Sequence, residues 1–282
     1  MTNKALCVGI NDYPGVGNDL GGCVNDAKDW AELLTTTYGF PEGNITMLLD
    51  SQATKQAITG NLESLLTGAE SGDVVVFTFS GHGTWRPDES GDESDGRDEA
   101  LCAHDGIIID DDIRQIIKNM GEGVHFTFIS DSCHSGSVTR QMLERAGEYK
   151  VNTTDEEYVP KPRFMPPDVA AEVFHYELRS IPFSSFFANL FSVFSSFLSL
   201  FKEGPEILLS GCKDDEYSFD AFIDGRRNGA FSAIAIRLMK ENPSTSYDEF
   251  YTELRKYLPS VSYQQSPQIR GGLEARRRKL FA

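Results

Sequence analysis

The chain has 282 residues, a formal net charge of -17 and 40% hydrophobic side chains, enough apolar material for one large domain or two small ones. Its acidic balance argues against nucleic acid and anionic membrane surfaces as partners, and fits a basic partner or substrate. Five cysteines without paired spacing make a disulfide framework improbable, so we expect a reducing, cytoplasmic compartment. The first four residues lack the pattern of a signal peptide, and no long N-terminal pro-segment is expected.

The first hundred residues alternate between strand and helix patterns. Residues 5–10 and 45–49 read as buried strands, and residues 20–27 lead into a helix. Thr54 is expected to cap a second helix that ends at Gly68. This rhythm predicts an α/β fold, with a parallel sheet covered by helices on both faces.

Two further apolar runs are each followed by a chemically suggestive motif. Residues 74–79 precede Ser80-Gly81-His82-Gly83-Thr84, and residues 124–129 precede Asp131-Ser132-Cys133-His134-Ser135-Gly136. A lone cysteine after a strand is usually a small buried apolar residue, and a lone loop histidine usually has no function. Adjacent parallel strands, however, would bring His82 beside Cys133 at the ligand-gathering edge of the sheet, which predicts a catalytic dyad.

These two motifs resemble the active-site signatures of metacaspases and orthocaspases, and the resemblance extends over residues 5–272. It implies a three-layer α/β/α caspase-like fold with a mostly parallel central sheet. Residues 1–282 would form a single peptidase domain. Its parts would be a large-subunit region, a linker with a Phe-rich helical insertion, and a small-subunit region, at residues 1–140, 141–203 and 204–282.

The implied activity is that of a cysteine endopeptidase working through an acyl-enzyme. Cys133 would attack the scissile carbonyl as a thiolate, and His82 would protonate the leaving amine. The backbone N–H groups of Gly83 and Cys133 are the expected donors to the oxyanion. No third member of a triad is evident from the sequence.

The resemblance also implies a pocket for the P1 side chain, the residue whose carbonyl is attacked. Its expected lining residues are Cys23, Asp26, Ser80 and Asp131. Two carboxylates there would select Arg or Lys in peptide or protein substrates. The alternatives are a solvated first-turn acid for Asp26 and a loop-orienting acid for Asp131.

Residues 88–112 hold eleven acidic side chains against one base, Arg97. Most such runs are solvated loops, but several oxygens in one region also suit Ca²⁺ as an activator. No cofactor is expected to be required. The resemblance points to three calcium ligands, which are Asp98, Asp110 and Asp111. Calcium-binding relatives tend to carry another acid where this chain has Arg140.

Residues 140–167 are polar and Pro-rich and resemble the linker in which relatives are cut. We expect self-processing between Arg140 and Lys150, because the residues after these cations are unhindered. Residues 181–201 form a Phe-rich stripe at helical spacing, for which docking on the sheet or a partner is favoured over membrane contact.

The C-terminal region adds an apolar strand at residues 206–212, a helix ending at Met239 and a last helix over residues 247–257. A competing reading makes the chain a catalytically silent, caspase-like interaction module that binds through the Phe-rich helix. The presence of both His82 and Cys133 argues against it. An assay on fluorogenic Arg peptides, with and without calcium, separates the two.

Overall fold

The computed structural model describes residues 2–88, 96–133, 160–178, 201, 204–213 and 216–282, together with two short backbone strands between residues 151 and 158. A six-stranded sheet in the order β14-β11-β7-β3-β1-β2 forms its centre. All neighbours pair in parallel except β14, which is antiparallel to β11. The strands are β1 (Asn3–Gly9), β2 (Ile45–Leu49), β3 (Val74–Ser80), β7 (His125–Asp131), β11 (Ile207–Ser210) and β14 (Gln268–Arg270).

Alternate side chains of each central strand enter two different cores. On β3, Val74 and Val76 belong to one buried cluster, whereas Val75, Phe77 and Phe79 belong to the other. Successive side chains of a strand point to opposite faces, so a strand covered on both sides is apolar at every position. Both clusters are buried, which explains why these strands read as continuous apolar runs.

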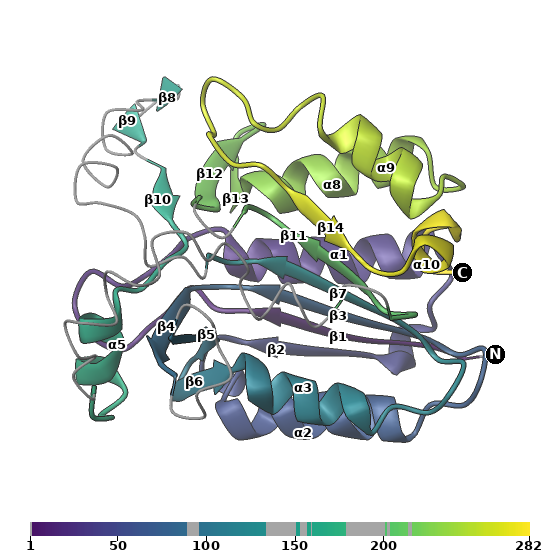
Figure 1. The fold of residues 1–282 in the computed structure, drawn as a ribbon. Helices are drawn as coiled ribbons and strands as arrows, with labels where there is room; N and C mark the ends of the chain where they lie inside the picture. Colours follow the sequence, from purple (N-terminus) through teal and green to yellow (C-terminus); the bar gives the residue numbers. More distant parts are fainter. Residues whose placement is uncertain are drawn as a thin grey trace.

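Helices cover both faces of the sheet, so the predicted three-layer α/β/α architecture is confirmed (Figure 1). Helices α2 (Lys55–Thr67) and α3 (Asp110–Lys118) lie on one face. The other face carries α1 (Cys23–Thr36), α8 (Ala230–Glu241), α9 (Tyr247–Leu254) and α10 (Leu273–Arg277).

Local signals fix several element boundaries. The Thr54 side chain accepts a hydrogen bond of 3.1 Å from the Ala57 N–H, and Gly68 is the C-cap of α2, as predicted. Helix α3 begins at Asp110, three residues before its first buried apolar side chain, Ile113. Its three first-turn acids, at positions 110–112, interact favourably with the helix dipole and extend the helix toward its N-terminus.

Two small sheets lie at the carboxyl edge of the central sheet, toward which β1, β3 and β7 point in Figure 1. One was not anticipated and takes up part of the acidic region, with strands β4 (Gly83–Pro87), β5 (Arg97–Ala103) and β6 (Gly106–Ile109). The other contains β10 (Lys161–Pro162), β12 (Phe219–Ile223) and β13 (Arg226–Gly229). Helix α5 (Pro167–Val173) follows β10.

The Phe-rich stripe lies outside the described residues, apart from its last member. Phe201 is fully buried, and its ring centroid lies 6.3 Å from that of Phe128 on β7. In the part of the chain that the structure describes, no helix has the length and apolar character needed to cross a membrane.

Candidate active site

The two candidate catalytic residues follow neighbouring strands. Ser80 at the end of β3 is the register partner of Asp131 at the end of β7, and His82 and Cys133 each stand two positions further on. His82 is 5% exposed and Cys133 is completely buried. The predicted convergence of the two motifs at the carboxyl edge of the sheet is therefore present in the fold.

The loop after β1 holds the His82 ring. Nε2 of His82 lies 2.7 Å from the carbonyl oxygen of Asn18, which can only accept, so Nε2 carries the proton. Nδ1 is buried without a hydrogen-bond partner among the described residues. Burial lowers the pKa of His82 to about 4, so the ring is neutral near pH 7 with Nδ1 able to take up a proton.

The thiol of Cys133 faces the segment that precedes β12. It lies 3.4 Å from the carbonyl oxygen of Ser218 and also contacts the Ser218 N–H. A second thiol, that of Cys212, is 3.9 Å away. Within the described residues, the Cys133 sulfur forms no hydrogen bond with the His82 ring.

A piece of the linker lies extended across this edge. Lys161 and Pro162 pair antiparallel with Asp220 and Phe219 of β12, and the Arg163 N–H donates to the Ser218 carbonyl at 2.8 Å. Two residues later the Met165 N–H donates to the Gly83 carbonyl at 2.9 Å. The linker thus adds a strand to one edge of β12, which is how many proteins hold extended peptides.

The carbonyl oxygen of Arg163 accepts two converging hydrogen bonds. The Gly83 N–H donates at 3.0 Å and the Cys133 N–H donates at 3.1 Å. These are the two donors that the sequence suggested for an oxyanion, and they meet on a peptide carbonyl of the same chain. The bond that follows this carbonyl is Arg163–Phe164.

The guanidinium of Arg163 is completely buried among three carboxylates. Nη2 lies 2.7 Å from Asp26 and 3.3 Å from Asp220, and Nη1 lies 3.2 Å from both the carboxylate and the carbonyl oxygen of Asp131. All three acids are at most 2% exposed. The N–H donors of a planar guanidinium point in several directions, so one arginine can contact acceptors on separate sides.

Backbone and hydroxyl donors hold each carboxylate in place. Asp26 accepts from the Gly229 N–H at 2.9 and 3.0 Å, and Asp131 accepts from the Ser232 N–H at 3.0 Å. Burial raises the pKa of Asp26 to about 6, although the nearby Arg163 opposes this shift. A Cβ at Gly229 would lie 2.6 Å from Nη1 of Arg163, so the pocket wall requires glycine there.

Both carboxylate oxygens of Asp220 accept hydrogen bonds from the loop that precedes α1. Asp220 accepts from the Gly21 N–H at 2.9 Å and from the Gly22 N–H at 2.8 Å, and so joins β12 to the start of α1. Asp220 was not among the pocket residues expected from the sequence. An acid in the otherwise apolar stretch at residues 219–223 is the signal that could have found it.

The other predicted pocket residues lie close by. Cys23 is buried at the start of α1, where burial raises the pKa of its thiol and the Arg163 charge opposes that rise. Ser80 is 1% exposed and is the register partner of Asp131. Of the four predicted pocket residues, Asp26 and Asp131 make the ion pairs with Arg163.

The predicted calcium ligands are paired with arginines. Asp98 contacts Arg86 at 3.1 Å, and Arg114 contacts Asp110 at 3.5 Å and Asp111 at 3.6 Å. In the described part of the chain, no group of three His, Cys, Asp or Glu residues is arranged to hold a metal ion. The three carboxylates do not form a calcium site as they stand here, and calcium activation stays a prediction.

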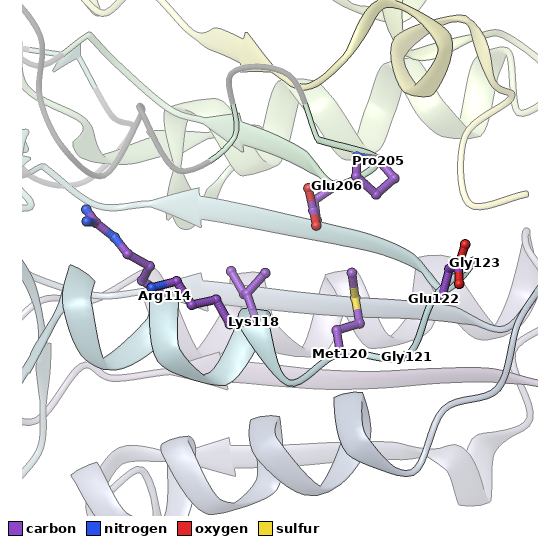
Figure 2. A pocket seen from close by; sticks show the side chains of 9 residues that line it. Arg114, Lys118, Met120, Gly121, Glu122, Gly123, Pro205 and Glu206 are labelled. Carbon is purple, nitrogen blue, oxygen red and sulfur yellow. The ribbon is translucent and has the colours of Figure 1, made fainter.

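A cavity of about 570 Å³ lies far from this chemistry, between α3 and the start of β11 (Figure 2). Its walls include Arg114 and Lys118 of α3, the turn at Gly121–Gly123 before β7, and Glu206 before β11. The turn at Gly121–Gly123 and Glu206 lie at the amino ends of strands β7 and β11, whereas Cys133 follows a carboxyl end. The cavity therefore has no part in the site described above.

Comparisons with known proteins place the chain among the metacaspases. Residues 3–141 match the family described as "Metacaspase, peptidase C14 domain". Metacaspase-1 of Emericella nidulans is 34% identical over 94% of this chain and 69% of its own length. Metacaspase-4 of Arabidopsis thaliana is 42% identical over 56% of this chain and 39% of its own length.

The crystal structure of protein GSU0716 from Geobacter sulfurreducens shares the fold. It covers 100% of this chain and 99% of its own, with a TM-score of 0.71 at 24% identity. The chain spans less than three quarters of the length of the two metacaspases named above, at 69% and 39%. By its sequence similarity over nearly its whole length, the chain belongs to the metacaspase family of cysteine peptidases.

Proposed function

We propose that the chain is a cysteine endopeptidase that cleaves after Arg or Lys in peptides and proteins and that first cleaves its own linker. The observation that carries this proposal is the placement of Arg163. Its carbonyl oxygen accepts from Gly83 and Cys133, and its guanidinium fills a pocket of three acids. A substrate needs the same two features, a carbonyl beside the nucleophile and a side chain in the P1 pocket.

The charge of the pocket supports a basic P1 residue. Three buried carboxylates repel Asp or Glu, because bringing a further anion among them costs both desolvation and like-charge repulsion. Arg can contact all three acids at once, as Arg163 does, whereas the single ammonium of Lys has fewer directions to donate. We therefore expect cleavage after Arg to be faster than cleavage after Lys.

In the proposed reaction, the Cys133 thiolate attacks the carbonyl carbon held at the position of Arg163. The negative charge that develops on oxygen is stabilised by the N–H groups of Gly83 and Cys133. His82 receives the thiol proton at Nδ1 and passes it to the leaving amine, while Nε2–H stays on the Asn18 carbonyl. Water then hydrolyses the thioester, with His82 acting as the base.

The same geometry supports self-processing at the Arg163–Phe164 bond. The residues between Arg140 and Lys150, where the sequence favours the cut, lie outside the described residues. Until the bond is cut, Arg163 occupies the pocket and competes with any other substrate. Cleavage here would convert a self-occupied chain into an enzyme with an accessible site.

The test is to purify the wild type, Cys133→Ala, Arg163→Gln and Lys161→Gln and to map their fragments by mass spectrometry. Wild type and Lys161→Gln should give a fragment ending at Arg163, whereas Cys133→Ala should stay whole and Arg163→Gln should lose this cut. Lys161→Gln is the matched control, since it removes a nearby linker cation whose ammonium donates to the Asp19 carbonyl.

Peptide assays test the activity apart from the self-cut. Processed wild type should hydrolyse Arg peptides fastest, Lys peptides next and Asp peptides not measurably. Full hydrolysis of Arg peptides by Cys133→Ala would overturn the assignment of the nucleophile. Hydrolysis after Asp but not after Arg would overturn the assignment of the pocket.

A further inference from the structure

Two thiols meet beneath the candidate oxyanion site. The sulfur atoms of Cys133 and Cys212 are 3.9 Å apart, and both residues are buried, at 0% and 5% exposure. Cys133 follows β7 and Cys212 follows β11, two strands that pair in parallel with Ser130 opposite Ser210. The closeness of the thiols is therefore a consequence of the central sheet.

Hydrogen bonds fix the backbone on both sides of the pair. The Gly211 N–H donates to the Ser130 carbonyl at 2.9 Å, and the Ser210 hydroxyl donates to the Cys212 carbonyl at 3.0 Å. The Cys212 thiol also lies 3.7 Å from the Ser132 carbonyl oxygen, which keeps it directed toward the β7 side. The two sulfurs thus face each other across neighbouring strand ends.

The remaining three cysteines are placed differently. All five cysteines are buried, and among the described residues the sulfur atoms of Cys133 and Cys212 contact each other. Burial raises the pKa of Cys7 to about 12, and it also raises the pKa values of Cys23 and Cys102. Thiols that stay protonated react slowly with oxidants.

We propose that Cys133 and Cys212 form a site of reversible oxidation, in which Cys212 is the resolving thiol that captures Cys133 after it reacts with a hydroperoxide. The proposal rests on the proposed function to the extent that Cys133 is the thiolate nucleophile. It assigns to Cys212 a chemical role outside peptide hydrolysis.

The chemistry balances with hydrogen peroxide as the two-electron oxidant. The Cys133 thiolate attacks one peroxide oxygen, the O–O bond breaks, and hydroxide leaves and takes up a proton, which gives a sulfenic acid and water. The Cys212 sulfur then attacks the Cys133 sulfur, the S–S bond forms, and the S–O bond breaks. The departing hydroxide takes the Cys212 proton as a second water.

The sulfurs must approach from 3.9 Å to about 2.05 Å, a movement that side-chain rotation supplies in part. The disulfide would remove the nucleophile and would also stop oxidation short of the irreversible sulfinic acid. In the uncut chain the Arg163 carbonyl accepts the Cys133 N–H and Cys133 is fully buried, so peroxide should react faster after processing.

The experiment uses processed wild type, Cys212→Ala and the matched control Cys7→Ala, each normalised to its own untreated activity on an Arg peptide. Each is treated with hydrogen peroxide, assayed, and assayed again after dithiothreitol. Wild type and Cys7→Ala should lose activity on oxidation. On reduction, each should regain about tenfold more activity than Cys212→Ala regains. Equal recovery in wild type and Cys212→Ala would overturn the proposal.

Peptide mapping of the oxidised wild type gives a readout independent of hydrolysis. A peptide pair linked through Cys133 and Cys212 is expected, and its absence from an oxidised, inactivated sample would also overturn the proposal. Should Cys212→Ala fail to fold, Cys212→Ser supplies the same test. If the protein lacked peptidase activity but still formed this disulfide, the proposed function would be refuted and the proposed oxidation site would be supported.

Discussion

The main-chain N–H of His82 donates a hydrogen bond of 2.9 Å to the phenol oxygen of Tyr13, which in turn donates to the Cys102 carbonyl at 3.0 Å. The two rings are also in contact, with centroids 4.8 Å apart. A Cβ at Gly81 would lie 2.5 Å from the same phenol oxygen, so the residue before His82 must be small. Tyr13 therefore fixes both the backbone and the ring of His82.

Tyr13→Phe should lower kcat of the processed enzyme about threefold to tenfold with little change in KM, because one hydrogen bond that positions His82 is lost. Hydrolysis of an Arg peptide measures this. Tyr38→Phe is the control, since it removes a buried hydroxyl without a hydrogen-bond partner in the described residues. Equal kcat values for the two variants would show that Tyr13 does not position His82.

Loss of the Arg163 cation should destabilise the uncut chain. In a Cys133→Ala background, Arg163→Met leaves three buried carboxylates without their guanidinium, and we expect a loss of about 3 kcal/mol in the free energy of unfolding. Urea unfolding measures it. Lys161→Met, which removes an exposed ammonium, should cost less than about 0.5 kcal/mol. Equal losses in the two variants would contradict the ion-pair account.

Stability should depend on pH through His82. Burial lowers its pKa from 6.5 to about 4, so the unfolded chain binds the proton more tightly than the folded one. The stability of the folded state is complete above pH 6.5 and is lost as the pH falls toward about 4. In a Cys133→Ala background, the free energy of unfolding should fall between about pH 7.5 and about pH 4.5. The substitution His82→Gln should make this fall smaller by about 2 kcal/mol.

Urea titrations at the two pH values measure this difference, with His104→Gln as a control for the number of histidines. The subtraction between variants also removes the opposite contribution of Asp26, whose pKa is raised to about 6 by burial and whose ionisation destabilises the fold as the pH rises. An unchanged pH dependence in His82→Gln would mean that the ring is not buried as described.

Calcium, if it binds, must displace the arginine partners of the acidic residues. We expect millimolar Ca²⁺ to raise the activity of the processed enzyme, and Asp110→Asn and Asp111→Asn to abolish that response. Asp112→Asn is the matched control, because this neighbour on α3 pairs with Lys55 at 2.8 Å instead. Activity that a chelator leaves unchanged would favour arginine-paired carboxylates without a metal.

The fold and the convergence of the candidate catalytic residues could be predicted because their signals are local. Continuous apolar runs identify parallel strands covered on both faces, and the carboxyl ends of adjacent parallel strands meet at one edge. His82 and Cys133 stand immediately beyond such ends, so their convergence follows from strand order alone. The resemblance to metacaspases supplied the pocket acids Asp26 and Asp131.

The remaining contacts join residues that are far apart in the sequence, so no local pattern predicts them. Arg163 and Asp26 are 137 positions apart, and Asp220 and Gly22 are 198 apart. The Asn18 contact uses a backbone carbonyl, which every residue has, so the sequence carries no mark of it. The cut expected between Arg140 and Lys150 stays a prediction, because these residues lie outside the described part of the chain. The described linker segment that pairs with β12 carries Arg163, which Pro162 and Phe164 flank.

Arg163 and Cys133 belong to one polypeptide, so dilution does not change how often the proposed nucleophile meets its proposed first substrate. A cut made within the molecule follows first-order kinetics, with the same half-life at nanomolar and micromolar protein, whereas a cut between molecules slows in proportion to dilution. The interval between folding and the first cleavage would then be set by each chain alone. Expression level would determine how many active molecules exist, and would not determine when any one of them becomes active.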